Sequence, residues 1–407
     1  MKVSMRSATT LIAAMALVSS IGAATAQKKY DTGVSDTEIK IGNIMPYSGP
    51  ASAYSVIGRT EAAYFRKVND EGGINGRKIN FISYDDSYSP PKTVEQARKL
   101  VESDRVLLIF NSLGTPTNTA IHHYMNQKEV PQLFVATGAT KWADPKDFPW
   151  TMGWQPNYQT EAGIYARYIL GHKPNAKIAV LFQNDDYGKD YLKGLVDGLG
   201  NKADMIVAKE SYDVSEPTIS SHIVKLQASG ADVLFAVATP KFAAQTIRKV
   251  RQLLWDPLFI LNNVSASVGA VLKPAGLEHA KGIISAAYME DETDPRWMNE
   301  PDSREWAAFL DKYMPDADRS DAGVAVGYSV ARTLVHVLDM CGDNLTRENI
   351  MKQAANLKDF DPGLLLPGIK INTSTSDYAP IEQLQMMRFN GKSWEFFGPV
   401  MNAEASS

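Results

Sequence analysis

The feature that most constrains the fold is a regular alternation of short apolar runs with longer amphipathic stretches. The first series has apolar runs at 39–45, 78–84, 106–110 and 132–136, with stretches of helical spacing at 61–69, 91–102 and 117–127 between them. A second series follows Trp154, with apolar runs at 177–182, 205–208, 232–237 and 258–261. Strands that alternate with helices form parallel sheets covered by helices. The sequence therefore predicts two α/β lobes, each a doubly wound, Rossmann-like parallel sheet.

The last third of the chain does not repeat this alternation. One apolar run at 283–288 precedes three helical stretches at 303–314, 324–340 and 347–357, and short strands are predicted at 369–371, 384–389 and 394–397. Helices with so few strands fit better as additions to the first lobe, and the closing strands can return to the second. Several crossings between lobes predict a hinge in place of a single flexible linker.

The N-terminus has the pattern of a secretory signal peptide. Lys2 and Arg6 precede an apolar stretch at 11–18, and Ala24-Thr25-Ala26 supplies small residues at a cleavage site. We predict cleavage after Ala26, with a retained N-terminal anchor as the alternative. The only cysteine, Cys341, lies in an apolar helical stretch, so we predict a buried thiol and no internal disulfide in this exported chain.

Composition and motifs disfavour several function classes. The chain has 407 residues, 44% hydrophobic residues and a net charge of −4, which is typical of a soluble globular protein and disfavours nucleic acid as a partner. No phosphate-binding, zinc-protease, nucleophile-elbow or CxxC motif is present, so we predict no enzyme activity, no cofactor and no metal. Gly391-Lys392-Ser393 is predicted to be a hairpin turn, and His122-His123 to lie on a solvated helix face.

Paired acids and polar loops follow several strands. Asp85-Asp86 and Asp185-Asp186 are compatible with catalysis, but acids at the start of a helix are usually caps, which we predict here. Two loops with small residues, at 110–117 and 135–140, each lead from a strand end toward a helix. Parallel sheets bind ligands at this edge, and free N–H groups at helix N-termini receive carboxylates. The loops are predicted to form a carboxylate cradle, with ordinary loop structure as the alternative.

Together these segments resemble a known family. The marks are Ser48-Gly49-Pro50 with Tyr54, the run at 69–77, Tyr84-Asp85-Asp86, the run at 184–188 and the run at 229–232. In order and spacing they resemble the periplasmic solute-binding proteins of ABC transporters of the branched-chain amino acid (Leu/Ile/Val) type. The resemblance implies the type 1 periplasmic binding fold, with ligand between two lobes.

The resemblance also implies limits for the lobes. Residues 1–26 are the signal peptide, 27–156 plus 288–367 form lobe 1, and 157–287 plus 368–407 form lobe 2. Three crossings are expected near 154–158, 286–288 and 366–369. The family's disulfide is absent, because its two positions fall near Tyr88 and Leu113.

The family's pocket is carried over position by position. The carboxylate loops correspond to 112–117 and 137–140, and aromatic walls to Tyr54 and Tyr187. Asn263 stands where the family's amino-acid binders place a Glu, and Thr239 where they place a Tyr. The expected ligand-binding residues are Tyr54, Ser112, Gly114, Thr115, Gly138, Ala139, Thr140, Tyr187, Thr239 and Asn263.

The change at Asn263 bears on the ligand. A buried ammonium without a carboxylate carries a large unpaired-charge cost, so the expected ligand is a carboxylate without an α-amine. Tyr54, Tyr187, Trp154 and Phe242 make an aromatic acid a candidate. Each is also compatible with structural packing, which is favoured for Trp154 and Phe242. A small amide or a branched-chain amino acid stays open, because a one-residue alignment shift moves Asn263.

The resemblance implies a periplasmic binding protein that delivers a small carboxylate to a membrane ABC permease. We expect a monomer with no nucleic-acid partner and no membrane insertion, which closes about its hinge on the ligand. One alternative is a ligand-sensing receptor of the same fold, such as an amide or amino-acid sensor that acts on a signalling partner. Another is an exported hydrolase, for which no nucleophile–base motif is present.

Overall fold

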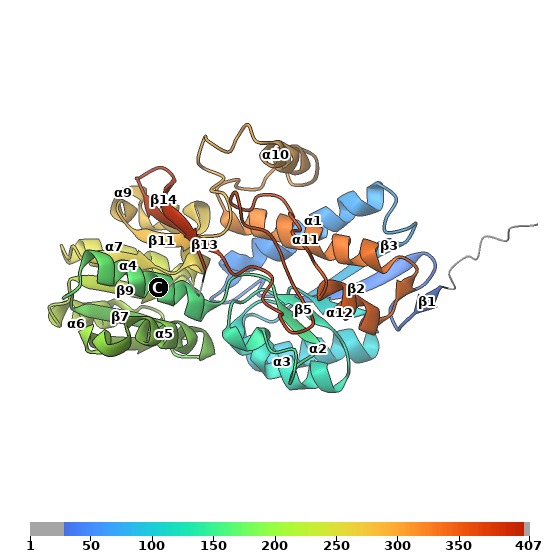
Figure 1. The fold of residues 1–407 in the computed structure, drawn as a ribbon, viewed down its shortest axis with the longest axis horizontal. Coiled ribbons are helices and arrows are strands. Elements are labelled where there is room, and N and C mark those ends of the chain that lie inside the picture. Colours follow the sequence, from blue (N-terminus) through green and yellow to red (C-terminus); the bar gives the residue numbers. More distant parts are fainter. Residues whose placement is uncertain (1–27, 403–407) are drawn as a thin grey trace, which may run out of the picture.

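The computed structural model describes residues 28–402. The predicted signal peptide and its cleavage site lie outside the described residues. Figure 1 shows two halves joined side by side, with β2, β3 and β5 in one half and β7, β9 and β11 in the other. We call the half built on the first sheet lobe 1 and the half built on the second sheet lobe 2.

Lobe 1 contains a five-stranded sheet with the order β3-β2-β4-β5-β6, in which all pairs are parallel. Its strands are β2 (Glu38–Met45), β3 (Lys78–Asp85), β4 (Leu108–Phe110), β5 (Gln132–Val135) and β6 (Thr151–Gly153). Helices α1 (Ser55–Asp70), α2 (Pro90–Arg98) and α3 (Thr115–Gln127) connect them. The first four strands confirm the sequence prediction. The fifth, β6, was not predicted, because three residues are too few to show a period.

Lobe 2 contains a seven-stranded sheet with the order β14-β13-β11-β10-β9-β7-β8. Five strands are parallel: β7 (Ile178–Gln183), β8 (Ile206–Tyr212), β9 (Val233–Val237), β10 (Leu258–Leu261) and β11 (Ile284–Ala287). An antiparallel hairpin, β13 (Leu384–Phe389) and β14 (Trp394–Met401), completes the sheet beside β11. The closing strands therefore return to lobe 2, and Gly391-Lys392-Ser393 lies in the predicted hairpin turn.

The central strand β9 shows why its residues form a strand buried on both faces. Val233 and Phe235 pack on the side of α4 (Tyr158–His172) and α5 (Asp186–Leu199), whereas Leu234 and Ala236 pack on the side of α6 (Ser220–Ala228) and α7 (Pro240–Gln252). Side chains alternate between the faces of a strand, so a continuous apolar run fills both cores. This burial fixes the carboxyl ends of the strands, where the loops of interest begin.

Three further helices follow β11 and pack on lobe 1. They are α10 (Pro301–Tyr313), α11 (Ala322–Cys341) and α12 (Arg347–Ala354), and α11 lies along α1, where Tyr328 meets Tyr64 edge to face (Figure 1). A two-residue strand, β1 (Lys29–Tyr30), pairs with β12 (Asn344–Leu345) at the far end. Of the described helices, α11 alone is long and apolar enough to span a membrane, yet 67% of its most apolar window is buried in this fold.

Some local predictions need correction. The predicted strand at 369–371 is not formed; only Ile371 makes a bridge, to Phe360, because the segment has no neighbouring sheet edge to join. His122 is not on a solvated face: it is buried and stacks on Phe148 at 3.8 Å, and burial lowers its pKa to about 4. The prediction of a buried Cys341 thiol is confirmed.

The two acid pairs behave differently. Asp185 caps α5 by accepting a hydrogen bond from the Gly188 N–H at 3.2 Å, as predicted. Asp86 instead accepts from the Tyr88 N–H and the Thr93 hydroxyl, and no side-chain cap begins α2. The acids at 85–86 therefore stabilise a turn, and the prediction of a helix cap there is wrong.

Candidate functional site

A cavity of ≈140 Å³ lies between the two lobes. Its walls come from the loops after β4 and β5 in lobe 1, the loops after β9 and β10 in lobe 2, and the segments after β6 and β11 that pass between lobes. The volume is close to that of a cavity that holds benzene, so the space suits a ligand of roughly six to ten non-hydrogen atoms. Both lobes and the segments joining them therefore contribute to one partly enclosed site.

The lobe 1 wall is the turn from β4 into α3. Gly114 has φ 101°, and a Cβ added there would lie 2.5 Å from the Tyr88 ring, so only glycine fits this approach. Thr115 is the first residue of α3, and its N–H has no acceptor among the described residues. A free N–H at a helix N-terminus, together with the helix dipole, favours an anion. This wall is therefore suited to a carboxylate.

The lobe 2 wall is the turn from β9 into α7, and its polar groups are already paired. The Thr239 N–H donates to the Tyr212 hydroxyl at 3.1 Å, and the Thr239 hydroxyl donates to Gln183 at 3.2 Å. Tyr187 accepts a hydrogen bond from the Asn262 amide at 2.8 Å and is 3% exposed. Because its polar groups are paired, this wall contributes its shape and aromatic surface to the cavity instead of free hydrogen-bond donors.

Asn263 lines the cavity where lobe 2 meets the segment after β11. Its N–H donates to the Glu161 carboxylate at 2.7 Å, and its side-chain amide donates to the Ala286 carbonyl at 2.6 Å. Glu161 also accepts from the Tyr165 and Tyr191 hydroxyls, at 2.8 and 2.7 Å. Burial raises the pKa of Glu161 to about 7 despite these donors. The buried Glu161 carboxylate, which was not predicted from the sequence, thus anchors the loop that contains Asn263.

The second predicted carboxylate loop has a different role. Thr140 donates both its N–H, at 2.8 Å, and its hydroxyl, at 3.0 Å, to Asp190 on α5 of lobe 2. The next residue, Lys141, forms an ion pair with Asp186 at 2.6 Å. Gly138 accepts from the Tyr158 N–H, and a Cβ there would meet the Pro156 carbonyl at 2.3 Å. This loop therefore joins the lobes beside the cavity.

Two further hydrogen bonds join the lobes. The Tyr54 hydroxyl donates to the Val264 carbonyl at 2.8 Å, and Ser267 donates to Asp321 at 3.1 Å. Tyr54 thus both lines the cavity and bridges the lobes. The described conformation is therefore one in which the lobes touch around an enclosed space.

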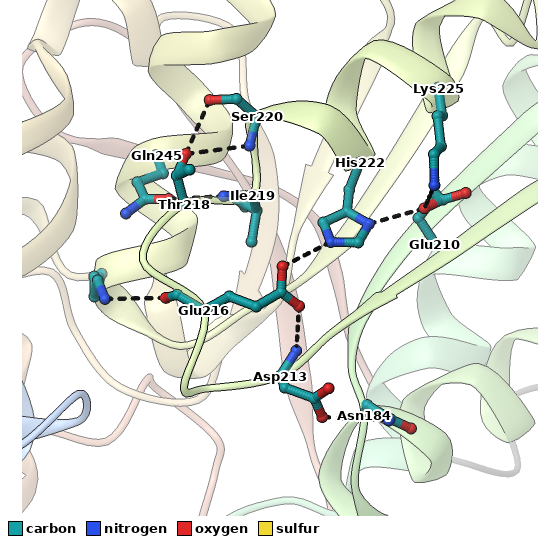
Figure 2. A network of polar contacts seen from close by, with 11 residues as sticks. Asn184, Glu210, Asp213, Glu216, Thr218, Ile219, Ser220, His222, Lys225 and Gln245 are labelled. Atoms are coloured by element: carbon teal, nitrogen blue, oxygen red, sulfur yellow. Dashed lines mark hydrogen bonds and ion pairs between the residues drawn. The ribbon is translucent and has the colours of Figure 1, made fainter.

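A polar cluster within lobe 2 ties the loop after β8 to α6. Figure 2 shows His222 between Glu210 and Glu216, with ring nitrogens 2.8 and 2.9 Å from the carboxylates. Burial lowers the pKa of His222, but its two carboxylate partners outweigh burial and the pKa is raised. The loop's Val214 packs on a lobe 1 cluster that includes Leu113. The histidine therefore stabilises a loop of lobe 2 that also contacts lobe 1.

The Asp, Glu, Lys, Arg and His side chains among the described residues that line the cavity are all acidic. Four carboxylates line it, and no Lys, Arg or His does; they are Glu290, Asp291, Glu292 and Asp321. Burial raises the pKa of all four, that of Glu290 to about 7. The cavity is therefore short of positive charge near the segment after β11.

The expected ligand-binding residues divide into two groups. Six line the cavity: Tyr54, Gly114, Thr115, Tyr187, Thr239 and Asn263. Four are not among its lining residues: Ser112, Gly138, Ala139 and Thr140. Ser112 is turned inward and bonds Asn118. For all ten residues, contact with a ligand stays a prediction.

Aromatic side chains form much of the cavity surface. Trp154 lines the cavity and donates its ring N–H to Thr333 at 3.1 Å, so it serves both packing and site. Phe242 is fully buried against Tyr212 and is not a lining residue, so its role is packing. Tyr88, Tyr158, Tyr288, Trp394 and Phe396 line the cavity but were missed, because nothing in their local sequence marks them.

Comparisons with known proteins agree with this architecture. The model of a family described as periplasmic binding protein matches residues 38–393. A "Leu/Ile/Val-binding protein homolog 1" of Brucella suis is 26% identical over 321 residues, covering 76% of this chain and 81% of the relative.

Two solved structures share the fold at low identity. A branched-chain amino acid ABC transporter protein from Thermus thermophilus with bound valine superposes with a TM-score of 0.81 at 15% identity, covering 91% of this chain and 97% of that one. A fatty acid ABC transporter substrate-binding protein from Thermomonospora curvata gives 0.77 at 20% identity, covering 93% and 95%. These likenesses establish the type 1 periplasmic binding fold.

Proposed function

This chain belongs to the periplasmic binding protein family, and we propose that it captures a small carboxylate between its lobes and delivers it to a membrane ABC permease. The family is one of solute-binding proteins and not of enzymes. The proposed mechanism is capture followed by closure about the hinge, which removes the ligand from water. The protein works in the periplasm as a monomer after cleavage of its signal peptide.

The observation that carries this proposal is the enclosed cavity with the α3 N-terminus in its wall. The free Thr115 N–H and the close approach at Gly114 support a carboxylate at this wall. A ligand seated there contacts both lobes, so it stabilises the closed arrangement. Residues 27–156 plus 288–367 and 157–287 plus 368–407 are the proposed lobe limits, with the hinge where the chain passes between sheets.

The body of the ligand is proposed to be apolar or aromatic and to carry no α-ammonium at the position of Asn263. The Asn263 amide is occupied by the Ala286 carbonyl, and its side chain has no charge with which to neutralise an ammonium. Of the two similar structures, one holds bound valine and the other is a substrate-binding protein of a fatty acid transporter. The fold is therefore compatible with carboxylic acids that carry an amine and with those that lack one. The pocket residues of this chain determine which of the two it binds.

The experiment is thermal unfolding of the mature protein with a panel of benzoates, hydroxycinnamates, aliphatic acids, amides and branched-chain amino acids. A ligand at 100 times its Kd stabilises the folded state by about 2.7 kcal/mol. We expect a rise in Tm with carboxylic acids and no rise with the matching amides. A rise with leucine or valine alone would contradict the proposed absence of an α-ammonium.

A further inference from the structure

We propose that the ligand carries a second carboxylate, which binds beside Lys241 and Arg248 in a groove that adjoins the cavity. This inference rests on the proposed function and narrows it from a small carboxylate to a dicarboxylic acid. The first carboxylate stays at the α3 N-terminus, and the chain between the two acids occupies the apolar and aromatic part of the cavity.

The groove has a volume of ≈760 Å³ and is formed by both lobes. Lobe 1 contributes the segment after β2, at 49–53, and lobe 2 contributes the loop at 214–215, the first turns of α7 and the segment at 270–274. The groove is more open to solvent than the cavity. Because both lobes line it, the groove is complete only when the lobes are together.

The groove and the cavity share a boundary. Ala53, Pro240 and Ala270 line both spaces, the first from lobe 1 and the other two from lobe 2. The boundary therefore lies where the two lobes face each other, and all three of its side chains are small. A ligand chain longer than the cavity has its route into the groove here, between the lobes.

The two spaces carry opposite charges. Lys241 and Arg248 are the only charged residues among the described residues that line the groove, whereas the charged residues that line the cavity are all acidic. Both belong to α7, and their spacing of seven residues places them on one face of the helix, about 10 Å apart along its axis. With no lining carboxylate to neutralise these cations, the groove attracts an anion.

Neutral groups hold both cations in place. Lys241 Nζ donates to the Glu216 carbonyl at 3.4 Å, and Arg248 Nη1 donates to the Pro274 carbonyl at 2.7 Å. The Glu216 carboxylate is itself bonded to His222, as Figure 2 shows. These contacts position the two charges without pairing them with an acid. A carboxylate in the groove therefore accepts charge-assisted hydrogen bonds from groups that are already positioned.

The order of the residues along α7 predicts which cation matters more. Lys241 follows Pro240 on the shared boundary, so a second carboxylate that leaves the cavity meets Lys241 first. Arg248 lies two turns farther along the helix. We therefore expect Lys241 to dominate for shorter dicarboxylates, with a larger share for Arg248 as the chain lengthens.

The test compares dicarboxylates with monocarboxylates of equal chain length, in which a methyl group replaces the second carboxylate. The pairs are hexanedioate with hexanoate, octanedioate with octanoate, and decanedioate with decanoate. Calorimetric titration of the mature protein should give at least about tenfold tighter binding of the dicarboxylate in one pair or more. This preference should shrink between about 0.05 M and about 0.5 M salt, because the groove is open to solvent.

Variants locate the preference in the groove. It should disappear in the double variant Lys241→Gln with Arg248→Gln and persist in Lys241→Arg. Ala53→Phe should also reduce it, because a larger side chain at the shared boundary obstructs the chain without changing any charge. The control is Lys249→Gln, which makes the same chemical change on α7 at a residue that does not line the groove, and should keep the preference.

Each outcome has a defined meaning once thermal unfolding shows that the variants are folded. Binding of monocarboxylates as tight as that of dicarboxylates at every length would overturn the inference and leave carboxylate capture standing. A preference unchanged in the double variant, or an equal loss of both classes of acid, would overturn it as well. Failure of all six acids to bind counts against the proposed function, and the inference falls with it.

Discussion

Two Thr-Pro turns face the cavity, one from each lobe, and they differ in what they leave free. Thr115-Pro116 follows β4 and Thr239-Pro240 follows β9, so each places a helix N-terminus at the carboxyl edge of a parallel sheet. In lobe 1 the Thr115 N–H has no acceptor among residues 28–402, whereas in lobe 2 the Tyr212 hydroxyl accepts the Thr239 N–H. Similar local sequences therefore leave a backbone N–H free to bind a ligand in lobe 1 and a backbone N–H already paired within the protein in lobe 2.

The difference teaches that a turn motif does not define a binding group by itself. In lobe 1, Gly114 lets Tyr88 approach without covering the helix end. In lobe 2, Gln183, Tyr212 and Asn262 come from other strands and satisfy the turn from outside. We expect lobe 1 to bind the ligand's charge and lobe 2 to provide shape, which the following variants test.

The largest effect is expected for Gly114→Ala. The backbone there has φ 101°, and the new Cβ would lie 2.5 Å from the Tyr88 ring and 2.6 Å from the Thr117 hydroxyl. Strain and overpacking together should lower the free energy of unfolding by about 3–4 kcal/mol and abolish ligand binding. Urea unfolding and calorimetry measure both. In the control Gly72→Ala, φ is also positive but the space is open, so only about 1–2 kcal/mol is expected.

The next effect concerns the pH dependence of lobe 2. Glu161 has a folded pKa of about 7 against an ordinary 4.5, so the folded state holds its proton more tightly than the unfolded state. This contribution to stability is complete below about pH 4.5 and is lost as pH rises through 7, by about 3 kcal/mol. Glu161→Gln should flatten the curve of unfolding free energy against pH over this range. An unchanged curve would show that the network around Asn263 does not titrate.

A matched pair of proline variants compares the two turns directly. Thr115→Pro removes the free N–H at a position where proline is tolerated, so ligand affinity should fall about tenfold. It also removes the 2.6 Å hydrogen bond between the Thr115 and Thr137 hydroxyls, which should lower stability by about 1 kcal/mol. Thr239→Pro removes an N–H that is bonded to Tyr212 and a hydroxyl that is bonded to Gln183, so stability should fall by about 2 kcal/mol and affinity should change less. The comparison is wrong if the two variants have equal effects on affinity.

The smallest effect is expected at the loop after β8. Because the pKa of His222 is raised, its contribution is present below about pH 6.5 and is lost as pH rises through the folded pKa. His222→Gln should therefore lower stability by less than about 1 kcal/mol near pH 6 and by nothing measurable at pH 9. Unfolding at the two pH values measures this. An equal loss at both would mean that packing, and not charge, holds the loop.

Much of the fold was predictable because it depends on local periodicity. The apolar runs at 39–45 and 232–237 are long enough to show burial on one or both faces, and helices of ordinary length separate them. The short strand β6 and the lone bridge at Ile371 carry no such signal, and there the predictions failed. His122 was misjudged for a related reason: the segment that covers it, with Phe148, lies outside its own helix.

The same distinction between local sequence signals and contacts from distant segments applies to the candidate site. The sequence by itself determined that two sheets end in polar turns and that no charged residue stands at Asn263. Only the tertiary structure showed that Thr140 donates its hydrogen bond to Asp190 instead of lining the cavity. The same is true of the hydrogen bond that Glu161 accepts from the Asn263 N–H. The tertiary structure also brought Asn111 and Glu292 to one cavity from segments far apart in the chain. Periodicity is a property of neighbours in sequence, whereas hydrogen-bond partners across a cleft depend on how two lobes close.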